Sequence, residues 1–135
     1  MNSWRSEGEK KMKMNGDMFS TYILIEESSG RYNLKKVVST QTIAFLDGVK
    51  GTIIDFDTGE PLSDVIVTLD FFPTKSNSNG EYEVQIPAAP LPIRFHIIGY
   101  KKGGYETNFV KWAILGPSPF ATILMGLDVQ MKKQE

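Results

Sequence analysis

The stretch that decides the fold runs from residue 49 to residue 102 and contains three segments. They read VKGTIIDFDTGEPLSDVIVTL at 49–69, SNSNGEYEVQIP at 76–87 and IRFHIIGYKK at 93–102. Apolar and polar residues alternate in each segment, which is typical of β-strands with one buried face. Pro61 and the Asn79-Gly80 pair mark turns between them. No long segment has a helical period, so the sequence predicts an all-β fold.

The alternation also predicts which side chains form the core, because successive residues of a strand point to opposite faces. The residues expected to line one core are Tyr82, Val84, Ile86, Val65, Val67, Leu69, Phe95 and Ile97, with Phe71 on the face of Leu69. A last strand at 126–131 is expected to turn Leu127, Val129 and Met131 inward. The only histidine, His96, is expected on the outward face of its strand.

Five short pieces in this order resemble the carboxypeptidase-regulatory-like family, a small β-sandwich of transthyretin-like type. They are Gly51, the TGEPL turn at 58–62, Asp64 with Val65, the NGEY run at 79–82 and the IGYK run at 98–101. The resemblance covers about residues 49–102, and loosely 127–133. It implies a single antiparallel Greek-key β-sandwich, as in transthyretin (prealbumin). Within that family the module is an appendage of a catalytic domain or precedes the plug of TonB-dependent receptors, so the resemblance implies no catalytic role.

Outside this module, the sequence predicts two further parts. Residues 1–20 form a polar N-terminal arm that is either flexible or ordered by a partner. Residues 21–48 form an extra β-hairpin around a Ser/Gly turn, ahead of the β-sandwich at 49–133. The segment 103–120 is long and aromatic for a connection. It is either a core strand at 109–115, a contact surface for another subunit, or a sugar-binding platform of Tyr105 and Trp112.

Composition excludes several kinds of function. A chain of 135 residues is one domain by length. Its net charge of −1 argues against a nucleic-acid interface, which needs a basic face. The absence of cysteine excludes disulfides, zinc-thiolate sites and thiol nucleophiles. No apolar run approaches the roughly 20 residues of a membrane span, and the first residues have no pattern of a secretory signal.

The residue types needed for catalysis or metal binding are scarce. One histidine cannot supply a two-histidine metal site, and no nucleophile motif accompanies it. Asp55, Asp57 and Glu60 form an acidic cluster, but Gly59 occupies the place of a calcium ligand, which favours a turn. The sequence therefore predicts no enzyme, no cofactor and no metal site.

The function expected from these observations is a non-enzymatic structural subunit that acts by protein–protein interaction within a larger assembly. Its most concrete form is a bacteriophage virion component of the capsid, collar or tail, assembled in the host cytoplasm. The alternative is an exported bacterial envelope module that binds a receptor or glycan, with its export signal trimmed. The expected partners are other protein subunits, including further copies of this chain, and neither nucleic acid nor a membrane span. Interface anchors are most often aromatic, and the candidates are Trp4, Tyr105, Phe109, Trp112 and Phe120.

Overall fold

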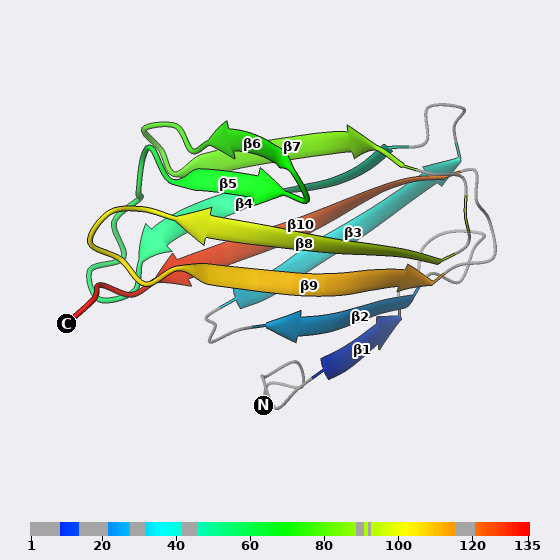
Figure 1. Cartoon of the computed structure of the whole chain (residues 1–135), viewed down its shortest axis with the longest axis horizontal. Helices are drawn as coiled ribbons and strands as arrows, with labels where there is room; N and C mark the ends of the chain where they lie inside the picture. The colour runs from blue at the N-terminus through cyan, green and yellow to red at the C-terminus, as the bar shows by residue number, and fades with distance from the viewer. Residues whose placement is uncertain are drawn as a thin grey trace.

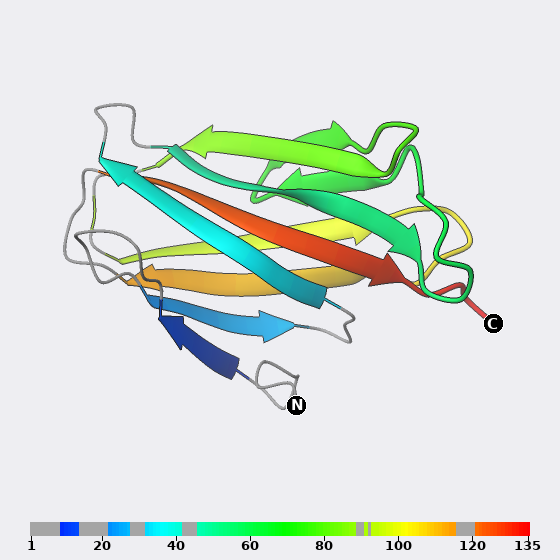
Figure 2. The same cartoon turned by 180° about the vertical axis from the view of Figure 1, so that it is seen from behind.

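The computed structural model describes residues 9–13, 22–27, 32–41, 46–88, 91, 93–115 and 121–135, which form ten β-strands in two sheets. The sheets lie as two layers, seen from opposite sides in Figures 1 and 2. One sheet has the order β1-β2-β9-β8-β5-β6, with β1 (Glu9–Lys13), β2 (Tyr22–Glu27), β9 (Asn108–Leu115), β8 (Ile93–Lys101), β5 (Ile66–Leu69) and β6 (Phe72–Lys75). The other has the order β3-β10-β4-β7, with β3 (Tyr32–Gln41), β10 (Ala121–Met131), β4 (Leu46–Asp55) and β7 (Glu81–Pro87).

Neighbouring strands are antiparallel in every pair except one. β10 pairs with β3 antiparallel but with β4 parallel, and its register shifts between Gly126 and Leu127. The expectation of a wholly antiparallel sandwich is therefore wrong at β10. What the structure confirms is an all-β chain of two packed, mainly antiparallel sheets.

The two strands predicted as an N-terminal hairpin do not pair with each other. β2 lies between β1 and β9 in the six-stranded sheet, whereas β3 pairs with β10 in the four-stranded sheet. The hairpin prediction is therefore wrong, because each strand finds a distant partner near the C-terminus instead of its neighbour. β1 lies within the segment 1–20 that was predicted as a polar arm, and it pairs with β2 along its whole length.

The core between the sheets follows the predicted alternation in β5, β7 and β10. Its buried side chains include Val65, Val67, Leu69, Tyr82, Val84, Ile86, Leu127, Val129 and Met131, as expected. For three residues the prediction of burial is wrong. Phe95 and Ile97 are exposed on the outer face of β8, and Phe71 is 92% exposed in the turn between β5 and β6.

Three of the five pieces that resemble the family, Gly51 and the runs at 79–82 and 98–101, contribute a residue around one backbone carbonyl, that of Leu127. The Tyr82 hydroxyl donates to it at 2.6 Å, and lies 2.8 Å from the Tyr100 hydroxyl. Since the one proton of Tyr82 goes to Leu127, Tyr100 is the donor to Tyr82. Gly51 approaches the same carbonyl so closely that a Cβ atom would overlap it. These motif residues therefore hold the two sheets together.

We expect Gly51→Ala to lower the free energy of unfolding by about 1–3 kcal/mol, because β10 must shift away from β4 to make room for the methyl group. Gly99→Ala is the matched control, since its nearest contact for a new Cβ is Asn108 O at 3.9 Å. We expect that variant to change stability by less than about 1 kcal/mol. Urea unfolding of both variants measures the difference. Equal stabilities would contradict the close approach at Gly51.

Candidate functional site

The aromatic residues predicted as partner contacts do not form one surface. Trp4 and Phe120 lie outside the described residues. Trp112 is buried on the inner face of β9, 5.4 Å from the ring of His96, so the core-strand alternative for this segment is confirmed. Tyr105 is half-buried near the C-terminus of the chain, where it bridges to Lys133. Phe109 lies on β9 beside Lys111, whose ammonium is 5.7 Å from the Phe109 ring centroid.

Tyr105 forms a hydrogen bond with the acidic turn after β4. Its hydroxyl donates to Asp55 Oδ2 at 2.6 Å, while Asp55 Oδ1 accepts the amides of Asp57 at 2.8 Å and Thr58 at 2.9 Å. These hydrogen bonds, the one from Tyr105 foremost, lower the pKa of Asp55 to about 2. The bond to Asp55 likewise raises the pKa of Tyr105 to about 12. Both carboxylate oxygens are engaged in shaping the turn, which confirms the turn interpretation of this cluster.

The outer face of the six-stranded sheet carries an apolar patch, which we name the β8 face. On β8, Ile93 is 50% exposed, Phe95 76% and Ile97 40%. Ile66 of β5 and Phe71 of the β5–β6 turn are exposed as well. Outward positions of a solvated strand are normally polar, so residues 93–97 of this strand are inverted with respect to the usual pattern, whereas Ile98 and Tyr100 are buried in the usual way.

The inversion brings charged side chains inside. Arg94 and His96 point from β8 toward β4, where they meet Asp47, and a second carboxylate, Asp70, reaches His96 from the β5–β6 turn. We name these four residues the Asp47 cluster. Arg94 binds Asp47 through two bonds, Nε to Oδ2 at 2.7 Å and Nη2 to Oδ1 at 3.0 Å, and donates from Nη1 to Leu91 O at 2.6 Å. The prediction that His96 faces outward is therefore wrong.

His96 bridges the two carboxylates of the cluster. Its Nε2 lies 2.6 Å from Asp47 Oδ2, and its Nδ1 lies 2.8 Å from Asp70 Oδ2. Burial alone would lower the pKa of His96, but the bonds and charges of Asp47 and Asp70 outweigh it, so this pKa is raised. Burial alone would raise the pKa of Asp47, but His96 and Arg94 outweigh it, so this pKa is lowered.

The geometry of the Asp47 cluster suits charge compensation between the sheets. The side chains of Asp47, Arg94 and His96 are almost completely enclosed, and both nitrogens of His96 are already engaged. Catalysis by histidine needs a nitrogen free to take or give a substrate proton. This cluster was not predicted from the sequence; the features that could have indicated it are Asp47 within an otherwise β-rich stretch, and Arg94 and His96 alternating with three large apolar residues.

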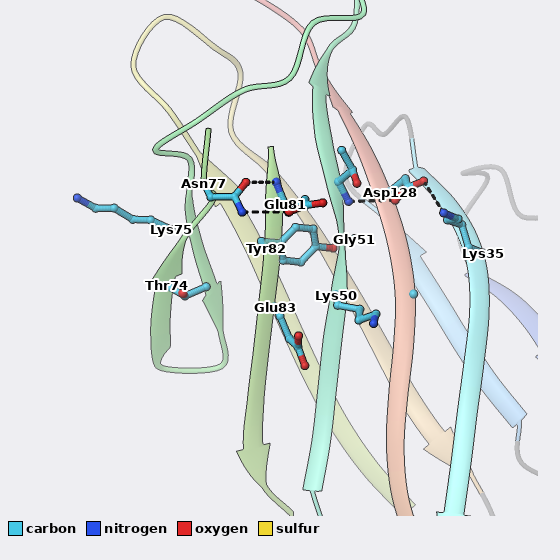
Figure 3. A pocket seen from close by; sticks show the side chains of 12 residues that line it. Lys35, Lys50, Gly51, Thr74, Lys75, Asn77, Glu81, Tyr82, Glu83 and Asp128 are labelled. Atoms are coloured by element: carbon cyan, nitrogen blue, oxygen red, sulfur yellow. Dashed lines mark hydrogen bonds and ion pairs between the residues drawn. The ribbon is translucent and has the colours of Figure 1, made fainter. Parts of the chain in front are cut away.

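A polar groove of about 660 Å³ lies on the outer face of the four-stranded sheet and extends to β6 (Figure 3). Its acidic side chains are already paired. Asp128 accepts the Thr52 amide at 3.0 Å and lies 3.6 Å from Lys35 Nζ, and Glu81 accepts from Asn77 at 3.1 Å. Lys50 of β4 also lines the groove, whereas the side chain of Lys75 on β6 points away from the other lining residues (Figure 3). Mixed hydrogen-bonding groups of this kind suit a polar ligand rich in hydroxyl or amide groups.

Within the described ranges, no group of three or more acidic or histidine side chains is arranged to hold a metal ion. The described part of the chain also contains no helix long and apolar enough to cross a membrane. The chain was compared with protein-family models and with curated proteins. No family model matches it, and no curated protein matches it significantly.

Proposed function

We propose that this protein is a non-enzymatic structural subunit of a larger protein assembly, and that it docks through the β8 face. The observation that carries the proposal is the exposure of Ile93, Phe95 and Ile97 along one strand of a sheet. Large apolar patches on a protein surface mark sites of interaction. The aromatic contacts expected from the sequence are replaced here by a neighbouring set, with Phe95 as the central anchor.

The inverted strand strengthens this proposal. A one-residue slip of β8 would move every side chain to the opposite face. It would bury Ile93, Phe95 and Ile97 and expose the charged pair Arg94 and His96. The same slip would expose Ile98 and Tyr100, which are fully buried. The observed register keeps these two residues in the core, compensates the desolvation penalty of the buried charges with Asp47, and leaves Ile93, Phe95 and Ile97 outside.

The charges around the β8 face suggest the chemistry of the partner. Ile66 lies between Lys75 and Lys101, its register partners on β6 and β8. Both lysines are exposed, and the outward positions of β5, β6 and β8 include no acidic residue. Complementary charges steer association and fix orientation. We therefore propose a partner protein whose apolar surface is flanked by acidic groups.

As the concrete form of the assembly we propose a bacteriophage virion, with this chain in the capsid, collar or tail. The finer fold assignment, a Greek-key sandwich of the carboxypeptidase-regulatory-like type, is part of the same proposal and is supported by the motif residues around Leu127. A second candidate is an exported envelope module that binds a receptor or glycan. The polar groove on the four-stranded sheet is the observation that favours it.

We expect Phe95→Thr to weaken docking by about 2 kcal/mol or more, as for a central interface anchor. Threonine keeps the strand propensity of the site, so unfolding should change by less than about 1 kcal/mol. Photo-crosslinking in the native host, with p-benzoylphenylalanine at position 95, identifies the contact. The same probe at exposed Gln130, on the outer face of β10, is the control. Crosslinks that are equal at both positions, or absent at 95, would contradict docking through the β8 face.

A further inference from the structure

The geometry of the bridge requires a proton on each ring nitrogen of His96. Carboxylate oxygens only accept hydrogen bonds, and His96 faces one carboxylate from each ring nitrogen, at 2.6 Å and 2.8 Å. Both contacts are hydrogen bonds only if a proton lies in each. A neutral ring carries one proton fewer, so one nitrogen lone pair would then face a carboxylate oxygen. Loss of this proton therefore turns one contact from attractive to repulsive.

The two ends of the bridge differ in how firmly they are held. Asp47 is 1% exposed and is clamped by the two bonds from Arg94. The Asp70 side chain is 25% exposed and belongs to a turn. When the proton leaves, the buried end stays in place, since withdrawing Asp47 would leave Arg94 unpaired inside the sandwich. The end that opens is the one at Asp70.

Asp70 occupies a tight turn in a conformation that depends on its contacts. It follows Leu69, whose register partner is Phe72, so only Asp70 and Phe71 span the loop between β5 and β6. Its φ of 55° lies in the left-handed region, which is unfavourable for residues other than glycine. Besides His96, Ile97 holds it: the Ile97 amide donates to Oδ1 at 3.0 Å, and the Asp70 amide donates to Ile97 O at 2.8 Å. Removing the His96 contact loosens a turn that carries Phe71.

The charges that face His96 come from each element packed around it. Asp47 approaches from β4, Asp70 from the β5–β6 turn, Arg94 from the same strand, and the uncharged Trp112 from β9. With a protonated ring, two negative and two positive charges balance. With a neutral ring, one negative charge remains uncompensated next to the core, and water reaches it most easily at Asp70.

We infer that the Asp47–His96–Asp70 bridge is a proton-controlled latch, which fastens the β5–β6 turn and its exposed Phe71 against β8 when closed and releases the turn when it loses its proton. The part of this inference that concerns docking rests on the proposed function of the β8 face. Ile97 lies on the β8 face, and Phe71 is exposed in the turn next to it. An open latch therefore alters the surface that a partner contacts. The closed state then favours docking.

The stability that the latch contributes has a defined pH dependence. The pKa of His96 is raised above its ordinary value of 6.5 in the folded protein. A group of this kind contributes stability that is fully present below its unfolded pKa and is lost as the pH rises through the folded pKa. Asp47, whose pKa is lowered from 3.8, contributes stability that is present above that value and is lost as the pH falls through its folded pKa. The latch is therefore most effective in mildly acidic solution.

The test is an NMR titration of the whole chain from about pH 4 to about pH 9, a range that includes the ordinary histidine pKa. His96 is the only histidine, so its ring signals need no further assignment. We expect its midpoint to lie above 6.5, and the backbone amides of Phe71 and Ile97 to shift with the same midpoint. The inference is contradicted if the midpoint lies at or below 6.5, or if the amide shifts of Phe71 and Ile97 do not change as His96 titrates.

Asp70→Asn separates the latch from a general charge effect. Asparagine tolerates the left-handed backbone, can still accept from the Ile97 amide, and can donate to a neutral ring, so the midpoint of His96 should move to lower pH. Asp64→Asn is the matched control, because Asp64 is exposed and has a φ of 56° but is not part of the cluster. The latch is wrong if Asp70→Asn leaves the midpoint unchanged, or if both variants move it equally.

The yield of crosslinking from the probe at position 95 is then measured over the same range of pH. Crosslinking that falls as His96 loses its proton supports regulation by the latch. Crosslinking that is strong but independent of pH refutes the regulation and leaves the proposed function standing. Absence of crosslinking at every pH refutes the proposed function, while the NMR result still decides whether the latch exists.

Discussion

Replacing Asp47 with alanine is expected to lower the free energy of unfolding by about 3–5 kcal/mol, the range for breaking a buried ion pair by removing one partner. Asp47 accepts two bonds from Arg94 and one contact from His96, and all three side chains are almost completely enclosed. Without the carboxylate, a guanidinium and an imidazole remain inside the sandwich with fewer acceptors. The side chains of Arg94 and His96 are only 6% and 7% exposed, so water compensates their charges poorly.

Urea unfolding of Asp47→Ala against the native chain measures this loss. Glu83→Ala is the control, since Glu83 is an exposed acidic residue on β7, the strand next to β4, where its carboxylate bonds only the exposed Gln85 side chain among the contacts described. Surface substitutions of that kind usually change stability by less than about 0.5 kcal/mol. A loss below about 1 kcal/mol for Asp47→Ala would mean that the Asp47 cluster is hydrated or rearranged, in conflict with the enclosed geometry.

Buried ion pairs rarely add net stability over apolar residues of the same size, so the role that we expect for the Asp47 cluster is to specify the arrangement of β8. Strand β8 has apolar residues on both faces: Ile98 and Tyr100 inside, Phe95 and Ile97 outside. With apolar residues at 94 and 96 as well, the strand could pair in either register. The bidentate bond from Arg94 to Asp47 is satisfied in only one of them, so it fixes which face of β8 meets solvent.

Local signals in the sequence were sufficient for much of the fold. The turn at 76–80 was read from its Asn-Gly pair, and in the structure Asn77 Oδ1 accepts the amides of Asn79 and Glu81 while Gly80 adopts a φ of 76°. The core of β7 was read from strict alternation. In both cases the information lies within a few residues, and neighbours in the chain determine the outcome.

Local signals in the sequence could not predict which face of β8 is buried. Alternation shows that a strand has two faces, but it does not show which face is inside when both carry large apolar residues. The decision depends on Asp47, which lies 47 residues before Arg94 in the chain. The pairing of β2 with β9, and of β3 with β10, depends on partners that are even more distant in the chain. The candidate site follows from the inversion, and was missed for the same reason.

Trp112→Ala is expected to destabilise the isolated chain by about 3–5 kcal/mol, as for large aromatic residues removed from a core. Trp112 is 4% exposed, and its ring packs against His96 at 5.4 Å. The substitution therefore leaves a cavity beside the Asp47 cluster and removes one wall of the His96 site. Thermal or urea unfolding of the chain without any partner measures the effect.

Phe95→Thr is the natural companion of this variant, because Phe95 lies on the neighbouring strand, one register position away from Trp112 and on the opposite face. The core aromatic should affect unfolding and the outer aromatic should affect docking, so the two effects should separate cleanly. If Trp112→Ala left unfolding unchanged and abolished docking, Trp112 would be the interface anchor expected from the sequence, and β9 would have to turn its other face to the core. Strand β9 is held between β8 and β2 with Val110 and Ile114 buried on the same side as Trp112, which is the reason to expect the loss in folding.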